Sequence, residues 1–309
     1  MPVIDFFVNN PRLLQLIAIN ALLALSIYLT LACGQLSLAN AAFMGLGAYS
    51  GALLTNRAGW PFLAVLLVAM LVPVAVALIV GLPTLRLRGV FLAIATIGLG
   101  EVLRVIIVTS ETLGGAEGIR RIPVKTAPWH LAAALAATMF LLWRLRGSRM
   151  GYAFEAIRED ESAARTMGIN TTFYKLTAFA LGAAIAGLAG ALKAHLFVAI
   201  TPGDYGFGQA VDILVFAVVG GSISFLGPVL GAALLTLLPE LLRTETLRGL
   251  GLEPGWQTLL LNGVILLLVI LFLPNGLISL FTRRWRRPVP LSSPETVEER
   301  RADVGAAPG

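Results

Sequence analysis

The charged side chains that could do chemical or mechanical work gather in one interval, residues 151–170, between two apolar segments. Apolar residues recur there at spacings of three and seven, so they would share one stripe of an α-helix. The stripe consists of Phe154, Ile157, Ala164 and Met167. A glycine, Gly168, is expected to end the helix. The pattern predicts a water-facing amphipathic helix over residues 152–168.

Such a helix spans no membrane, so its apolar stripe needs another surface to cover it. The bilayer surface is one candidate, but several acidic side chains would be repelled by an anionic leaflet. They are Glu155, Glu159, Asp160 and Glu161. We therefore expect the helix to sit in a groove of another protein.

Two acidic residues fall within or beside apolar segments. Glu101 stands three residues before Arg104, a spacing at which two side chains can pair on a helix. An ionisable group in lipid costs about 2.5–3.5 kcal/mol, so it should face the bundle interior or a water-filled path. Asp212 lies near the start of a shorter apolar segment. Both acids are candidates for a translocation path; the alternatives are a structural pair for Glu101 and a solvated helix start for Asp212.

Two breaks in the apolar pattern resemble each other, residues 34–38 and 221–225, and each is followed by a Gly-rich apolar stretch. Unwound backbone at such breaks exposes amide and carbonyl groups that can meet a zwitterion. The polar residues of the breaks are further path candidates: Gln35, Ser37, Asn40, Ser222 and Ser224. The alternative is that the Ser and Gly residues only allow helices to approach closely.

Several chemistries are disfavoured by what the sequence lacks. The phosphate-binding pattern G-x-x-x-x-G-K-[ST] does not occur, so the chain is not expected to hydrolyse ATP. One cysteine, Cys33, and two histidines, His130 and His195, offer no disulfide, thiol cluster or His-rich metal site. We expect no catalytic residue, no metal and no cofactor on this chain. An intramembrane enzyme, which would need Ser37 or Ser224 to meet His195, remains an alternative.

The elements that would carry these residues are membrane-spanning helices. The chain is 57% hydrophobic and 13% charged, against roughly 25% charged residues in soluble domains. Apolar segments lie at residues 13–33, 41–55, 60–82, 90–109, 128–143, 173–194, 210–220, 225–242 and 256–273. Backbone groups in lipid need partners within the segment, which favours helices. The fold class is therefore an all-α integral membrane protein of about 8–10 transmembrane helices, with broken or re-entrant segments where apolar runs are short.

Positive charge sets the expected orientation. Arginines flank the loop at residues 147–172 and follow the last apolar segment, so both places are assigned to the cytoplasm. We divide the chain into a transmembrane domain, 1–280, which includes this loop, and a basic, then disordered tail, 281–309. The net charge of +6 lies in short clusters at segment ends, a pattern that does not indicate nucleic-acid binding.

The stretch Glu161-Ser-Ala163-Ala164-Arg-Thr-Met-Gly168 resembles the EAA-and-glycine cytoplasmic loop of ABC importer permeases, although Ser162 is inserted into the usual acidic-Ala-Ala run. Four further stretches, in order, resemble the branched-chain amino-acid permeases of that group: residues 34–49, 87–101, 114–118 and 219–232. Within the LivH/LivM family the sequence is most similar to the LivM type. The resemblance extends over nearly all of the chain up to Pro274, and it implies the fold of a type II ABC importer permease.

The resemblance implies that the loop is a coupling helix seated in a cleft of an ATPase subunit. The implied coupling residues are Phe154, Glu155, Ile157, Arg158, Glu159, Glu161, Ala163, Ala164, Met167 and Gly168. It further implies two ABC ATPase subunits that bind ATP-Mg, a homologous LivH-like permease, an extracytoplasmic amino-acid-binding protein and a multi-pass location in the bacterial inner membrane. The inserted Ser162 leaves the docking register open.

By the same resemblance the chain forms half of a translocation path for branched-chain or other small hydrophobic amino acids. Related systems move urea, amides or aromatic acids, and no residue in the sequence selects between these substrates. A gradient-driven secondary carrier is a second alternative. It predicts acidic relays in mid-span, whereas the acids here concentrate in the loop.

Overall fold

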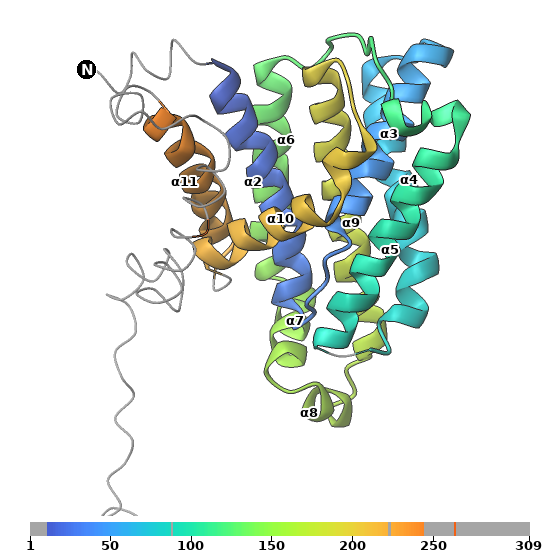
Figure 1. Ribbon diagram of the computed structural model, residues 1–309. Coiled ribbons are helices and arrows are strands. Elements are labelled where there is room, and N and C mark those ends of the chain that lie inside the picture. Colours follow the sequence, from blue (N-terminus) through green and yellow to red (C-terminus); the bar gives the residue numbers. More distant parts are fainter. Residues whose placement is uncertain (1–10, 88, 222–223, 244–262, 264–309) are drawn as a thin grey trace, which may run out of the picture. The chain divides into compact units, whose positions relative to one another are not determined.

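The long helices of the structure coincide with the apolar segments of the sequence (Figure 1). The computed structural model describes residues 11–87, 89–221, 224–243 and 263, and these contain ten α-helices and three 3₁₀ helices. In chain order the helices are α2 (Pro11–Ala32), α3 (Asn40–Ala58), α4 (Phe62–Thr84), α5 (Val90–Thr109), η1 (Glu111–Leu113), η2 (Gly115–Glu117), α6 (Pro128–Arg146), α7 (Arg149–Glu159), α8 (Glu161–Thr166), α9 (Thr171–Phe197), η3 (Pro202–Tyr205), α10 (Phe207–Gly220) and α11 (Leu226–Arg243).

The all-α membrane class is confirmed. Four helices of the described residues are long and apolar enough to cross a bilayer: α2, α4, α5 and α9. Helices α3 and α6 have 19 residues each, which is about 28 Å at 1.5 Å per residue. The predicted segment at 256–273, apart from Gly263, and the predicted tail at 281–309 lie outside the described residues. The total number of spans and the domain boundary at residue 280 therefore stay predictions.

Helix α9 forms the centre of the bundle and packs against α2, α3 and α4. Glycines make this close approach possible. A Cβ atom on Gly190 would overlap the carbonyl oxygen of Met44 in α3, and one on Gly187 would overlap that of Ala69 in α4. Backbones that approach this closely gain van der Waals contact that lipid cannot replace. The small residues of α9 thus fix where its neighbours lie.

The chain turns back into the bundle after α9. Ile200 and Ile119 form an antiparallel bridge at one end of the bundle. The backbone N–H of Ile200 donates to the carbonyl oxygen of Ile119 at 3.0 Å, and the N–H of Ile119 donates to that of Ile200 at 3.1 Å. Helix α10 then crosses the direction of α2 and α9 in Figure 1. Its 14 residues extend about 21 Å, too short for a hydrocarbon core of ~30 Å. The short segment predicted at 210–220 is therefore a crossing helix and not a straight span.

Helices α7 and α8 lie at the opposite end of the bundle from this bridge, beside the end of α6 and the start of α9 (Figure 1). The arginines that flank the loop, Arg144, Arg146 and Arg149, are at the same end by their places at the end of α6 and the start of α7. Arg57, at the end of α3, is at the other end, where its Nη2 donates to the Thr112 carbonyl oxygen at 2.9 Å. Arg57 is thus separated from the arginines that flank the loop.

The single helix predicted over residues 152–168 is wrong. The structure has two helices, α7 and α8, and Asp160 between them adopts an extended backbone with φ −153° and ψ 108°. The Asp160 carboxylate accepts the backbone N–H groups of Ser162 and Ala163 at 2.7 and 3.0 Å. An aspartate that caps a new helix start competes with continuation of the preceding helix. The cap explains the break.

Candidate functional site

The apolar stripe of α7 and α8 is covered by the chain itself. Phe154, Ile157 and Ala164 are 3%, 4% and 4% exposed and belong to the main hydrophobic core. Phe154 meets Tyr174 of α9 edge-on, with ring centroids 6.2 Å apart. The ends of α2 and α6 also contact α7. The expectation that this stripe lies free for a partner is therefore wrong, and α7 is part of the body of the bundle.

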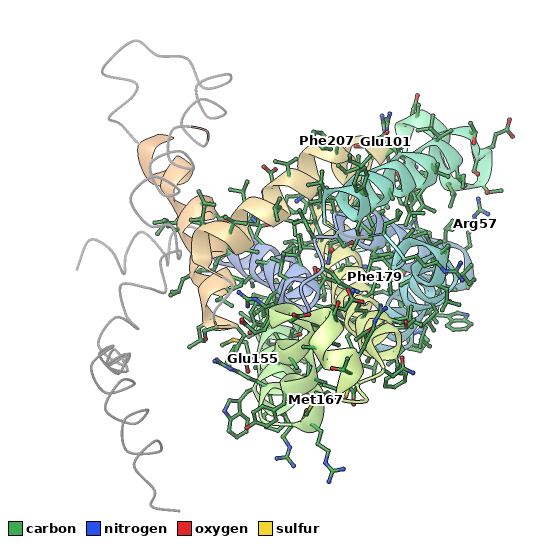
Figure 2. The ribbon with its side chains drawn as sticks, turned by 90° about the horizontal axis from the view of Figure 1, so that it is seen from below. Arg57, Glu101, Glu155, Met167, Phe179 and Phe207 are labelled. Atoms are coloured by element: carbon green, nitrogen blue, oxygen red, sulfur yellow. The ribbon has the colours of Figure 1, made fainter. Side chains whose placement is uncertain are left out.

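The opposite face of α7 and α8 is what the loop presents to its surroundings. The exposed members of the implied coupling set are Glu155, Arg158, Glu159, Ala163, Met167 and Gly168. Met167 is 82% exposed: α8 ends at Thr166, and Met167 follows as its C-cap residue instead of continuing the buried stripe. Figure 2, which looks onto this end, shows Glu155 and Met167 at the surface. This set, the exposed loop face, keeps its coupling role as a prediction.

Glu161 points inward and fastens α8 to α9. Its carboxylate contacts Lys175 Nζ at 2.7 Å and Arg165 Nη2 at 2.6 Å. The Glu161 and Lys175 side chains are only 16% and 10% exposed. Arg165 Nε also donates to Thr171 Oγ1 at 2.9 Å. The sequence reasoning missed Lys175, although a lone lysine at the start of an apolar segment, close behind an acidic loop, is a signal for such a pair.

The first helix break lies directly against α7. Gly34 has a φ of +71°, a conformation that favours glycine. A Cβ atom on it would lie 3.1 Å from the Arg158 Cα atom, closer than such atoms normally approach. The backbone of α7 therefore touches the backbone of the break. A displacement of α7 would reach residues 34–39 without an intervening side chain.

The polar residues of the first break are buried. Gln35, Ser37 and Asn40 are 2%, 0% and 2% exposed. The Asn40 side-chain amide donates to Ser26 Oγ at 2.8 Å, but its Oδ1 atom and both amide atoms of Gln35 have no hydrogen-bond partner within the described residues. Buried amides without partners are costly, so they mark a place where another arrangement or a bound molecule supplies the bonds. These path candidates are thus inside the bundle and not on a lipid-facing surface.

The two breaks share local geometry. Gly34 and Gly221 both have positive φ, +71° and +95°. Three residues after each glycine, a serine hydroxyl accepts the N–H two residues further on: Ser37 from Ala39 at 3.3 Å and Ser224 from Leu226 at 3.5 Å. The resemblance of the two breaks in the sequence therefore extends to the glycine conformation and to the serine hydrogen bond. Ser222 lies outside the described residues.

Glu101 pairs with Arg104, Nε to Oε2 at 2.8 Å, and both side chains are 41% exposed. Glu101 also lines a small pocket together with Leu38 from the first break and Tyr205 and Phe207 from the crossing segment. Figure 2 shows Glu101 beside Phe207. The structure thus places Glu101 in one pocket with Leu38 of the first break, whereas the path candidates Gln35, Ser37 and Asn40 do not line it.

Tyr205 is a member of this pocket that the sequence reasoning missed. It is 4% exposed, and its hydroxyl has no hydrogen-bond partner within the described residues. Tyr49 stands edge-on to it, with ring centroids 5.9 Å apart, and its hydroxyl is in the same situation. Polar tips enclosed by apolar rings in this way are a further mark of a polar interior around α3 and η3. No local sequence pattern announces it.

Asp212 is not brought into the Glu101 pocket. It is exposed on α10, and a different polar contact lies nearby, Lys193 Nζ to Gln209 Oε1 at 3.5 Å between α9 and α10.

His195, which the intramembrane-enzyme alternative needs, is hydrogen-bonded to other residues. Its Nδ1 donates to the Ala191 carbonyl oxygen and its Nε2 contacts Thr55 Oγ1, both at 2.8 Å, so its ring bonds to neither proposed serine.

Fold and site together define the class of protein. It is an all-α multi-pass membrane protein with two similar helix breaks, buried polar groups at one break, and a polar helical loop packed against that break. The comparisons with known proteins place it more narrowly. The profile of the family described as branched-chain amino acid transport system / permease component matches residues 11–271, and the chain belongs to this family.

Individual relatives agree with the family match. The chain is 33% identical to the high-affinity branched-chain amino acid transport system permease protein LivM of Salmonella typhimurium, over 80% of this chain and 64% of that protein. The Escherichia coli LivM is 32% identical over the same shares, and the Escherichia coli LivH is 33% identical over 48% of this chain and 44% of LivH. The chain thus spans less than two thirds of the length of the LivM proteins that it matches. No solved structure matches it.

Proposed function

We propose that the chain is a permease subunit of an ATP-driven importer in the bacterial inner membrane, and that it forms half of a path for branched-chain or other small hydrophobic amino acids. The substrate class is that of the LivM and LivH relatives, which are named as branched-chain amino acid transport permeases. The path is completed by a homologous LivH-like permease. An extracytoplasmic binding protein delivers the amino acid.

The observation that carries this proposal is the exposed loop face on a helix that the bundle holds in place. This face combines an apolar side chain, Met167 at 82% exposed, with several charged ones, and a partner protein would cover both kinds. The acids on this face disfavour the lipid surface as its cover. Two ABC ATPase subunits are therefore the proposed partners, ATP-Mg binds to them, and this chain performs no hydrolysis.

The contact between α7 and Gly34 supplies the route by which the motor acts. Closure of the ATPase subunits moves α7 and α8, α7 moves the first break, and the break borders the Glu101 pocket. Rocking of helices about a fixed site gives alternating access. Carriers for urea, amides or aromatic acids would use the same device, and a binding screen on the partner binding protein decides between these substrates.

The test is reconstitution of the complex in proteoliposomes with ATP inside. Met167→Glu is expected to abolish co-purification of the ATPase subunits and ATP-dependent uptake, because it buries a charge in the docking contact. Val124→Glu is the matched control, since Val124 is also an exposed apolar residue, 65% exposed, but lies between η2 and the start of α6, away from α7 and α8. That variant should keep the ATPase subunits. Uptake driven by an ion gradient without ATP would refute the proposal in favour of a secondary carrier.

A further inference from the structure

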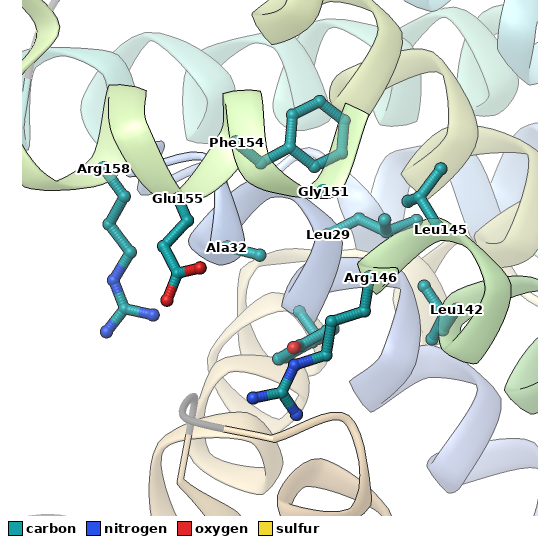
Figure 3. Close-up of a pocket in the computed structure, with 10 residues that line it drawn as sticks. Leu29, Ala32, Leu142, Leu145, Arg146, Gly151, Phe154, Glu155 and Arg158 are labelled. Carbon is teal, nitrogen blue, oxygen red and sulfur yellow. The ribbon is translucent and has the colours of Figure 1, made fainter. Parts of the chain in front are cut away.

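A second pocket lies at the loop end of the bundle, away from the Glu101 pocket. Its volume is about 70 Å³, and it opens between α2, the end of α6 and α7 (Figure 3). Its floor is apolar, with Leu29, Leu142 and Phe154 each 1–3% exposed. Its rim is charged, with Arg146 at the end of α6 and Glu155 and Arg158 on α7. The pocket is separate from the translocation path, although its rim residues Glu155 and Arg158 also belong to the exposed loop face.

The rim carries two arginines and one glutamate, distributed over two walls. Figure 3 shows Glu155 and Arg158 extending side by side from α7, while Arg146 extends from the other wall. Within the described part of the chain neither Arg146 nor Glu155 is in an ion pair. The rim thus holds two cations and one anion, and Arg146 on one wall with Glu155 on the other matches a small molecule that has a carboxylate, an ammonium group and an apolar side chain. That is the chemistry of a hydrophobic amino acid.

The position of the pocket gives such binding a consequence. The walls belong to α2 and α6, which are fixed in the bundle, and to α7, which transmits motion in the proposed mechanism. A molecule held by Arg146 on one wall and Glu155 on the other would tie α7 to α6. It would stabilise one position of α7 and oppose its movement, because a ligand favours the state to which it binds more tightly.

We propose that this pocket binds the imported amino acid on the cytoplasmic side, and that binding slows further import. The inference rests on the proposed function, since it takes the loop end as cytoplasmic and the amino acid as the product. The carboxylate of the amino acid pairs with Arg146, its ammonium group with Glu155, and its side chain fills the floor beside Leu29 and Leu142. The pocket is a product sensor and is separate from the path.

Direct binding tests the site with leucine as the probe, on the purified complex with its ATPase subunits. Arg146→Gln should weaken the affinity for leucine by about tenfold or more, the usual effect of losing a charged hydrogen-bond partner. Arg144→Gln is the matched control, because Arg144 is an exposed arginine of the same helix turn that does not line the pocket. N-acetylleucine and leucinamide, which each lack one charge, should bind less tightly than leucine.

Transport tests the regulation. Proteoliposomes loaded with leucine and ATP should take up labelled leucine more slowly than those loaded with ATP alone, and Arg146→Gln should remove this difference. Ala32→Leu, which fills the pocket from α2, should remove it as well. Ala137→Leu, the same change on an exposed position of α6, should leave it intact.

The outcomes separate the two proposals. ATP-driven uptake that internal leucine slows equally in Arg146→Gln and Arg144→Gln overturns the sensor and leaves the proposed function standing. Absence of ATP-driven uptake from every preparation overturns the proposed function, and equal leucine binding by the two arginine variants then overturns the site as well. If the pocket instead binds phosphatidylglycerol in preference to phosphatidylcholine in nanodiscs, if this binding depends on Arg146, and if leucine has no effect, the pocket is a lipid site and the inference is refuted.

Discussion

Replacing Glu161 by glutamine should loosen α8 while leaving the rest of the bundle folded. The wild-type carboxylate holds Lys175 of α9 at 2.7 Å and Arg165 of α8 at 2.6 Å. Glutamine has nearly the same shape, so the change removes charge and little volume. Lys175, with 10% of its side chain exposed, would then be a nearly buried cation without its carboxylate partner.

The size of the effect follows from burial. Breaking a buried ion pair by removing one partner costs about 3–5 kcal/mol. Arg165 is 53% exposed, so its part of the network is screened by water and contributes little. A glutamine oxygen can still accept one hydrogen bond from Lys175. We therefore expect about 2–3 kcal/mol less free energy for the local opening of α8, which is about 30- to 150-fold in its opening equilibrium.

Hydrogen–deuterium exchange on the purified protein measures this opening directly. The amides to follow are those of Met167 and Ile169, which donate to the carbonyl oxygens of Ala163 and Ala164 at 3.1 Å. Their exchange should speed up by the same factor, while peptides from α2 and α4 should not change. Glu159→Gln removes the same charge from an exposed position and should change exchange by less than about threefold. A Glu161→Gln variant that exchanges no faster than this control would refute the role of Glu161 in fastening α8 to α9.

Three further substitutions test other parts of the structure. Gly34→Ala should strain a backbone with positive φ by about 1–2 kcal/mol and push against α7. ATP hydrolysis by the complex should therefore continue while uptake falls. Parallel assays of hydrolysis and uptake test this, and an equal fall in both would contradict it. Gly190→Ala should lower the free energy of unfolding in detergent by about 2–3 kcal/mol, because its Cβ would overlap the α3 backbone. Gly98→Ala, whose Cβ meets only open space, should leave that free energy unchanged. Glu101→Gln should lower uptake by about tenfold with ATPase subunits still bound, and unchanged initial rates would remove Glu101 from the path.

Helix positions were predictable from this sequence because lipid imposes one rule on every span. Apolar runs had to become helices, so α5 follows the predicted 90–109 and α6 the predicted start at residue 128. Charge at the segment ends similarly separated the two ends of the bundle. The direction in which the α7 stripe faces was not predictable in this way. Periodicity shows that Phe154 and Ile157 share a face, but only the fold shows that α2, α6 and α9 cover it.

The candidate site was likewise predictable from the sequence only where its contacts are local. Pairing of Glu101 with Arg104 was readable because both lie on one helix turn. The Glu161–Lys175 contact depends on elements that are brought together only by the fold, and so does the Tyr205 hydroxyl, which has no partner among the described residues. The break at Asp160 was available locally, since an aspartate before Ser and Ala residues is a common helix cap, but the continuous apolar stripe concealed it.

Burial of the α7 stripe changes how the loop can act. A helix that hung from the bundle by flexible ends could dock to a motor and absorb its motion by swinging. Here Phe154 and Ile157 are core residues, Glu161 is bonded to α9, and the α7 backbone meets Gly34 at van der Waals distance. Packed interfaces of this kind move as units, because their side chains have few alternative arrangements. In the proposed mechanism, force on the exposed loop face therefore shifts the first helix break, where Gln35 and Asn40 hold buried amide atoms that have no hydrogen-bond partner within the described residues. The same rigidity would let a molecule lodged between Arg146 and Glu155 oppose that shift.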